Sequence, residues 1–245
     1  TPACRAPVGD AAKFACAQAY SICAERSLLY GTDANRWRQT AGEEKRLVAS
    51  DTLGKMSIRT LTTREIYRNP WIRLREDQIE RSNGTRSIYS VIEKDDCAVI
   101  IPIQDQTIYL VEQFRYTIQQ QSLELPQGGW ETAIVDPEEL ARGELREETG
   151  LVAETMIHLG TMWVAYGFAR QKQHVFLATG LTQESRDLDP EEHDLIVRTA
   201  TVPDFERMLL DGTIQDICTI AAWGQYMLWK QQNEATRTKP VAGSQ

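Results

Sequence analysis

Residues 136–151 of this chain read Asp-Pro-Glu-Glu-Leu-Ala-Arg-Gly-Glu-Leu-Arg-Glu-Glu-Thr-Gly-Leu, a run that carries the signals of one capped helix. Asp136 is a good N-cap, Pro137 suits the first helical position, and Glu139 lies where a capping box places its acid. Gly150 is a natural terminator because glycine adopts the left-handed conformation at low cost. The pattern therefore predicts a helix that starts at Pro137 and ends just before Gly150.

Three glutamates on this helix fall at i, i+3 and i+4, so Glu144, Glu147 and Glu148 share one face. Carboxylates this close repel one another unless a cation joins them. A hard divalent cation, Mg²⁺ or Mn²⁺, prefers such oxygen ligands. On spacing alone, a solvated glutamate-rich helix face explains the pattern equally well.

Read from Gly129, the segment resembles the box of the Nudix hydrolase superfamily. That signature is a glycine, five residues, a glutamate, seven residues, then Arg-Glu-apolar-any-Glu-Glu-any-Gly-apolar. The matching positions are Gly129, Glu144, Leu145, Glu147, Glu148, Gly150 and Leu151. The signature's first glutamate is Val135 here, and its arginine is Gly143. In the family that arginine orients a box glutamate by an ion pair, so its loss bears on catalytic efficiency more than on metal binding.

The flanking sequence resembles one branch of this family, the ADP-ribose pyrophosphatases and related nucleoside-diphosphate-sugar hydrolases. The resemblance covers about residues 58–230 and is carried by these segments: Tyr67-Arg68-Asn69-Pro70-Trp71, Val111-Glu112-Gln113-Phe114-Arg115-Tyr116, Leu123-Glu124-Leu125-Pro126, His174-Val175-Phe176-Leu177-Ala178 and Asp211-Gly212-Thr213-Ile214. It implies an α/β fold, a Nudix α/β/α sandwich with a mixed sheet, preceded by a small antiparallel β module.

The local signals along the chain agree with that organisation. Asn83-Gly84 lies between two extended segments and predicts a hairpin. Further strands are expected over 87–93, 98–103, 107–111, 156–164 and 173–178, and helices over 203–210 and 217–230. We expect a weakly structured extension (1–55), a β module that dimerises (56–96), the Nudix domain (97–232) and a flexible tail (233–245); an additional helix packed on the domain is the other reading of 1–55.

The resemblance implies roles for individual residues. Glu144 and Glu148 would bind Mg²⁺ or Mn²⁺ with help from Glu147, and the backbone carbonyl of Gly128 would be a further ligand. Glu147 and Glu148 would also serve the chemistry directly, and the acidic stretch 184–194 would supply a general base, with Glu191 and Glu192 as candidates. A solvated acidic loop is the alternative for that stretch.

Three residues are expected to contact the substrate. Arg115 would bind its phosphates, because a guanidinium matches phosphate oxygens with two parallel hydrogen bonds; a structural ion pair is the alternative. Trp71 would stack on the base, unless it is an ordinary core tryptophan, and Trp130 is a further candidate. By analogy with relatives, the β module crosses to a second subunit, so we expect a homodimer.

Composition limits the partners. The formal net charge of the 245 residues is −8, which disfavours a sequence-independent nucleic-acid binder. No run approaches the roughly 20 apolar residues that cross a bilayer. The five cysteines are odd in number and contain no Cys-x-x-Cys pair, which argues against a disulfide framework and a zinc site, and we expect a cytoplasmic setting. Residues 131–154 carry eight acidic and two basic side chains, which concentrates the acidity at the expected metal helix.

The expected function is Mg²⁺-dependent hydrolysis of ADP-ribose or a related nucleoside-diphosphate sugar to a nucleoside monophosphate and a sugar phosphate. Two alternatives stay open. Tyr166, after the box, is more typical of dinucleoside polyphosphate hydrolases. The replacements at Val135 and Gly143 favour a nucleotide-binding domain without catalysis.

Overall fold

The computed structural model describes residues 58–129, 136–186 and 194–237. The chain divides between Gly54 and Lys55, and every described residue belongs to the second unit. The expected N-terminal extension and residues 238–245 of the expected tail therefore lie outside the described residues.

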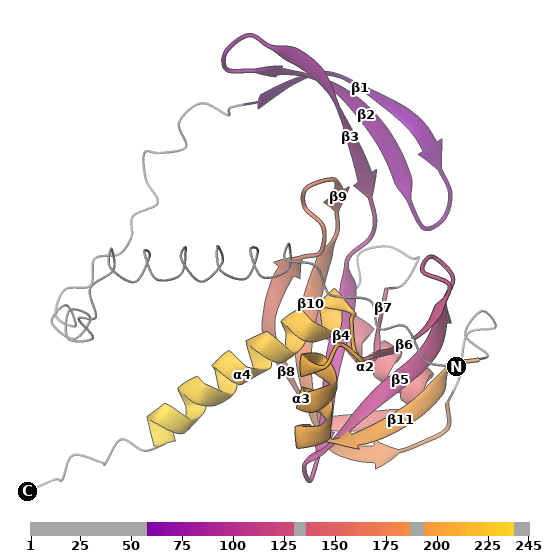
Figure 1. Cartoon of the computed structure of the whole chain (residues 1–245), viewed down its shortest axis with the longest axis vertical. Helices are drawn as coiled ribbons and strands as arrows, with labels where there is room; N and C mark the ends of the chain where they lie inside the picture. The colour runs from indigo at the N-terminus through magenta and orange to yellow at the C-terminus, as the bar shows by residue number, and fades with distance from the viewer. Residues whose placement is uncertain (1–57, 130–135, 187–193, 238–245) are drawn as a thin grey trace, which may run out of the picture. The chain divides into compact units, whose positions relative to one another are not determined.

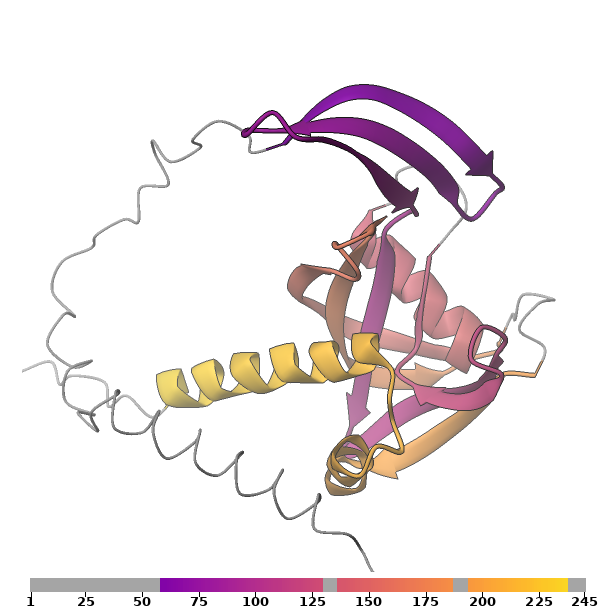
Figure 2. The ribbon, with the colours of Figure 1, turned by 45° about the horizontal axis from the view of Figure 1, so that its top comes forward.

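Strands β1 (Ile58–Arg68), β2 (Arg73–Arg81) and β3 (Arg86–Glu93) form an antiparallel sheet, drawn as one curved layer in Figure 2. The short strand β9 (Ala169–Arg170) adds to it in parallel with β3. The turn between β2 and β3 falls at the predicted position, where Gly84 has a φ of 82° and donates its N–H to the carbonyl of Arg81 at 2.8 Å. The predicted antiparallel β module is confirmed.

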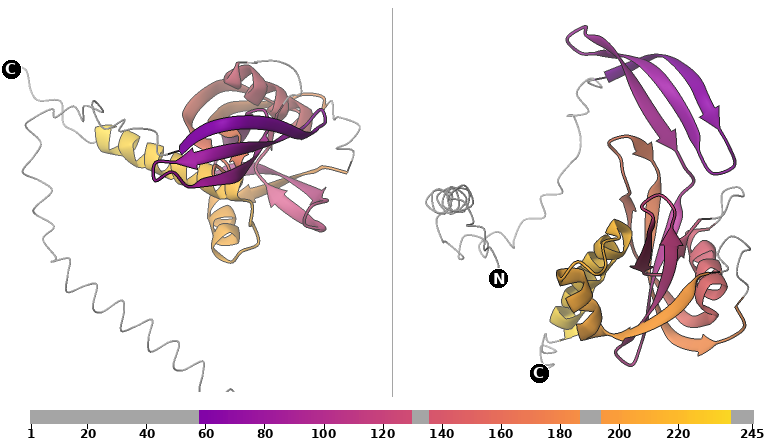
Figure 3. Two further views of the ribbon diagram at one scale, coloured as in Figure 1. Left: turned by 90° about the horizontal axis from the view of Figure 1, so that it is seen from above. Right: turned by 45° about the vertical axis from the view of Figure 1, so that its right-hand side comes forward.

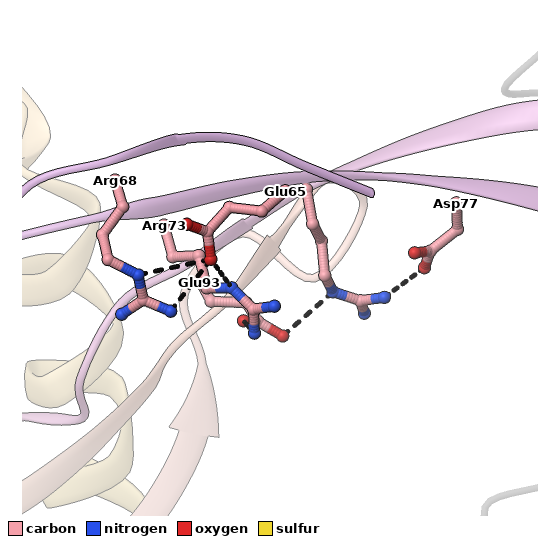
Figure 4. Close-up of polar contacts among 6 residues, drawn as sticks. Glu65, Arg68, Arg73, Asp77 and Glu93 are labelled. Atoms are coloured by element: carbon pink, nitrogen blue, oxygen red, sulfur yellow. Dashed lines mark hydrogen bonds and ion pairs between the residues drawn. The ribbon is translucent and has the colours of Figure 1, made fainter. Parts of the chain in front are cut away.

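One face of this small sheet carries a chain of ion pairs, shown in Figure 4. Arg73 bridges Glu65 and Glu93, with 2.8 Å between nitrogen and oxygen in each pair. Arg75 links Glu93 to Asp77, whose side chain is buried. Charged side chains thus take the place that apolar residues fill in a larger core.

The second sheet has the strand order β11-β5-β4-β10-β8, with β6 added to β5 and β7 added to β4. Its strands are β4 (Cys97–Gln104), β5 (Thr107–Arg115), β6 (Gln120–Glu124), β7 (Gln127–Gly128), β8 (Leu151–Trp163), β10 (Lys172–Gln183) and β11 (Ile196–Thr201). Strands β4 and β10 are parallel and the other pairs are antiparallel, so the sheet is mixed, as predicted.

The alternating side chains of strand β4 show how the mixed sheet is covered by helices on both faces. Its side chains alternate, so that Ala98 and Ile100 pack with Leu140 and Leu145 of helix α2 (Pro137–Thr149), on one side of the sheet. The residues between them, including Val99, face helices α3 (Val202–Leu210) and α4 (Ile217–Arg237) on the other side. The right-hand view of Figure 3 shows the sheet between these helices. The predicted α/β/α sandwich is confirmed.

The helix ends show which local signals were sufficient. Helix α2 has the predicted limits: Asp136 Oδ1 accepts the N–H groups of Glu138 at 2.9 Å and Glu139 at 3.3 Å, and Gly150 closes the helix with a φ of 73°. Helix α4 continues to Arg237, beyond the limit at residue 230 and into the expected tail. Figure 1 shows its length. No helix within the described ranges is both long and apolar enough to cross a membrane.

Candidate metal and pyrophosphate site

The glutamates of α2 differ in their exposure. Glu144 and Glu148 lie one turn apart on the face that packs against the sheet and are 6% and 1% exposed, whereas Glu147 is half-buried. Burying a carboxylate is costly unless cations or hydrogen-bond donors compensate its charge. The structure therefore separates the predicted set into two enclosed carboxylates and one at the edge.

The two residues of β7 present their backbone to these carboxylates. The N–H of Gln127 donates to Glu148 Oε2 at 3.0 Å. A Cβ added at Gly128 would lie 2.6 Å from the carboxyl carbon of Glu144 and 2.8 Å from its Oε1. Only glycine leaves room for that carboxylate, so Gly128 lies beside Glu144 as a shared ligand set requires.

Arg115, at the end of β5, pairs with Glu124 at the end of β6. Its Nε donates to Glu124 Oε1 at 2.8 Å and its Nη2 donates to Oε2. The hydrogen bond that Arg115 donates to Glu124 is the main cause that raises the pKa of Arg115, and the charges of Glu124, Glu148 and Asp216 add to it. The structural ion pair that the sequence left open is present, and the arginine also lies close enough to α2 to be affected by the charge of Glu148.

A polar network continues from this ion pair. Gln127 Nε2 donates to Glu124 Oε2 at 2.7 Å and to Asp216 Oδ2 at 2.9 Å. Asp216 precedes α4 and accepts the N–H of Thr219 at 2.8 Å. Sequence reasoning missed the roles of Gln127 and Asp216, and nothing in their spacing signals them. Glu124 belongs to the Leu123–Pro126 segment of the family resemblance, where it is a single acidic residue between two leucines.

Arg142 does not take the place of the arginine missing at Gly143. Arg142 Nε and Nη2 donate to Glu138, at 3.0 and 2.9 Å, and its Nη1 donates to the carbonyl of Ala153. Arg146 is exposed. Arg142 is thus engaged along its own helix and at β8, away from the paired glutamates.

Trp71 lies in the turn between β1 and β2 and is 51% exposed, so it is not a core tryptophan. The side chain of Asn69 shapes this turn by accepting the N–H groups of Trp71 at 3.0 Å and Ile72 at 2.8 Å. An exposed indole on a fixed turn can stack on an aromatic ligand.

Trp130, Glu191 and Glu192 lie outside the described residues. The residues that flank 187–193 are described and are fixed. Glu184 donates its N–H to the carbonyl of Gly150 at 2.7 Å, which ties the start of this stretch to the end of α2. Arg186 Nη2 donates to the carbonyl of Leu195 at 3.1 Å, which joins the two ends of the stretch.

These residues fit a divalent cation only as a mixed set. Within the described ranges, no group of three or more His, Cys, Asp or Glu side chains is arranged to hold a metal ion. Glu144 and Glu148 could supply two hard oxygen ligands, and Gly128 lies beside the carboxylate of Glu144, where its backbone carbonyl is the candidate for a third.

Residues 58–92 match a family model described as the nucleoside diphosphate sugar hydrolase N-terminal domain, and residues 94–216 match the NUDIX domain. The chain belongs to the Nudix family. The boundary between the two matches falls at Glu93, the last residue of β3, just before the mixed sheet begins with β4.

Among Nudix proteins, the chain is 29% identical to an ADP-ribose pyrophosphatase of Bacillus subtilis (strain 168), over 73% of this chain and 97% of that protein. It is 31% identical to an ADP-ribose pyrophosphatase of Mycobacterium tuberculosis (strain ATCC 25618 / H37Rv), over 66% of this chain and 79% of the relative. A crystal structure of an ADP compounds hydrolase superposes with a TM-score of 0.63 at 21% identity, over 72% of this chain and 96% of the other, which shows the shared fold.

Proposed function

We propose that this Nudix enzyme hydrolyses the pyrophosphate bond of ADP-ribose or a related nucleoside-diphosphate sugar, giving a nucleoside monophosphate and a sugar phosphate. The observation that carries the proposal is the pair of buried glutamates, Glu144 and Glu148, facing the backbone of β7. The two ADP-ribose pyrophosphatases among its relatives support the choice of substrate.

Glu144, Glu148 and the carbonyl of Gly128 would hold Mg²⁺ or Mn²⁺, with Glu147 assisting from the edge of the site. When bound, the divalent cation neutralises phosphoryl oxygens and lowers the pKa of an attacking water. The water oxygen bonds to one phosphorus, the bridging P–O bond breaks, and the departing phosphate keeps the bridging oxygen. Glu147, Glu148, Glu191 and Glu192 are the candidates to accept the proton of the water.

Arg115 and Trp71 would hold the two ends of the nucleotide. The ion pair with Glu124 uses Nε and Nη2 of Arg115, and the side chain is 37% exposed, so Nη1 lies outside that pair. We assign this edge of the guanidinium to the substrate phosphates and the exposed ring of Trp71 to the base. Trp130 stays a third candidate for substrate contact.

We also propose the domain limits 1–55, 56–96, 97–232 and 233–245, supported between the second and third by the separate family matches. A homodimer through the β module is the proposed assembly. The free thiols of Cys97 and Cys218 support a reducing, cytoplasmic setting.

The test is hydrolysis of ADP-ribose with Mg²⁺ or Mn²⁺, followed by chromatography of the products. AMP and ribose 5-phosphate are expected from the unaltered protein, and Glu148→Gln should reduce kcat by at least about 100-fold, since a metal ligand loses its charge. Glu139→Gln is the matched control, because Glu139 lies exposed on the same helix. Equal rates for both variants would contradict the assignment of Glu148.

The runner-up substrate class is the dinucleoside polyphosphates. Tyr166 is 81% exposed in the turn before β9, where its ring could stack on a second base. Diadenosine polyphosphates in the same assay distinguish the classes by kcat/KM. Nucleotide binding without hydrolysis of any substrate would support instead the non-catalytic alternative suggested by Gly143.

A further inference from the structure

Gln127 makes contacts at both of its ends. Its backbone N–H donates to Glu148 Oε2 at 3.0 Å, and its side-chain amide donates to Glu124 at 2.7 Å and to Asp216 at 2.9 Å. An amide NH₂ group has two protons, so each of the two carboxylates receives one. A half-buried glutamine thus joins three carboxylates from three separate segments of the chain.

The two carboxylates that accept hydrogen bonds from the Gln127 side chain, those of Glu124 and Asp216, are held in place by other contacts. Glu124 is 2% exposed and pairs with Arg115 through two hydrogen bonds. Asp216 accepts the N–H groups of Cys218 at 3.3 Å and Thr219 at 2.8 Å, which anchors it to the first turn of α4. The glutamine side chain therefore lies between an end of the mixed sheet and the start of a helix.

The backbone pairing of β7 is slight by comparison. This strand has two residues, and its register with β4 consists of Ala98 opposite Gly128 and Val99 opposite Gln127. A shift of β7 would move two contacts at once, the N–H bonded to Glu148 and the Gly128 backbone beside Glu144.

We propose that Gln127 is a positioning residue for the metal site, an inference that rests on the proposed function of Glu144 and Glu148. Its side chain donates hydrogen bonds to Glu124 and Asp216, and these bonds hold β7 in position. The backbone of β7 in turn holds the carboxylates of Glu144 and Glu148, the proposed metal ligands, in position. Groups that orient metal ligands from outside typically change metal affinity or activity by about 10- to 100-fold when they are removed.

Gln127→Met tests this role, because methionine has a similar length and no donor. Gln225→Met is the matched control: Gln225 is also half-buried, and its Nε2 donates to the carbonyl of Leu159 at 2.9 Å. Bound Mn²⁺ is measured by electron paramagnetic resonance without substrate, and circular dichroism checks folding. We expect the Mn²⁺ Kd to rise about 10-fold or more in Gln127→Met and to stay unchanged in Gln225→Met.

A second variant separates positioning from folding. Asp216→Asn keeps a side chain that can cap α4 and removes one charged acceptor of the Gln127 amide. It should weaken Mn²⁺ binding in the same direction, and the double variant should lose less than the two single effects combined, because both act through one contact. If Gln127→Met does not fold, the Mn²⁺ titration of Asp216→Asn alone tests the positioning role: weaker binding supports it and unchanged binding overturns it.

The outcomes distinguish the two proposals. Unchanged Mn²⁺ affinity in a folded Gln127→Met, or full additivity in the double variant, overturns the positioning role and leaves the hydrolase intact. If the wild-type protein hydrolyses none of the substrates but Gln127→Met still weakens Mn²⁺ binding, the positioning role is supported and the proposed function is refuted. A wild-type protein that binds no Mn²⁺ overturns both.

Discussion

Replacing Gly128 by alanine tests the geometry of the site most directly. Gly128 has no positive φ, so an alanine meets no backbone penalty there and the effect comes from its Cβ alone. That atom would lie 2.6 Å from the carboxyl carbon of Glu144, whereas ordinary contact begins at 3.4 Å. Oε2 of Glu144 would lie closer still, so the carboxylate must retreat by at least about 0.8 Å, because the backbone of a paired strand yields less than a side chain.

The size of the effect follows from that displacement. A misplacement of about 1 Å at a reacting site can cost roughly 100-fold in rate, or about 2.7 kcal/mol of barrier. We expect kcat for ADP-ribose hydrolysis to fall by about that factor at saturating Mg²⁺. Combining Gly128→Ala with Glu144→Asp should restore part of the loss, because aspartate withdraws the carboxylate by one methylene.

The assay is steady-state hydrolysis with a thermal unfolding curve for each variant. Gly224→Ala is the control, because a Cβ there meets nothing within 4 Å. As Gly224 lies within α4, this change should stabilise the fold by up to about 1 kcal/mol and leave kcat unaltered. A folded Gly128→Ala protein with wild-type kcat and metal requirement would refute the placement of Glu144 against Gly128.

Three further outcomes are expected. Burial raises the pKa of Cys97 to about 11 and that of Cys218 to about 12, so iodoacetamide at pH 8 should label both far more slowly in the native than in the unfolded protein, as followed by mass spectrometry; equal rates would contradict their burial. Burial by itself would raise the pKa of Glu124, but the hydrogen bonds and the charge of Arg115 outweigh this effect, so the pKa is lowered from 4.5. The resulting stability is full above pH 4.5 and is lost as the pH falls through the lowered value, so urea unfolding at pH 7, 4 and 3 should show a smaller acid loss for Glu124→Gln. Asp136→Ala should cost about 1 kcal/mol in calorimetry by uncapping α2, whereas Asp136→Ser should cost little; equal losses would exclude capping.

The elements that were predicted correctly have local causes. Asp136, Pro137 and Gly150 specify both ends of α2 within one short segment, and Asn83-Gly84 specifies a turn through its own backbone preference. Strands β6, β7, β9 and β11 were not predicted. Two of them, β7 and β9, have only two residues. These two and β11 exist through pairing with strands far away in the sequence, which periodicity within a segment does not report, and β6 pairs with β5, the strand just before it.

In the candidate site, too, contacts within one element were predicted from the sequence and contacts between distant segments were not. Helical spacing was enough to bring Glu144 and Glu148 together, because one turn separates them along a single element. It could not foresee that Gln127 would reach Asp216, since that contact joins segments 89 residues apart and depends on how α4 returns to the sheet. Nor could it choose between the substrate and the ion-pair role of Arg115, because the same guanidinium serves both geometries.

The hydrogen bond between Arg186 and Leu195 joins the described residues on either side of the stretch 187–193. With the two ends held together by residues outside it, a longer insert costs only the entropy of closing a larger ring, about 0.6 kcal/mol for each doubling of length. The hydrogen bond from the N–H of Glu184 to the carbonyl of Gly150 ties the chain just before this stretch to the end of α2. A protein engineer could therefore graft new sequences between these two anchors while leaving α2 and its glutamates in place.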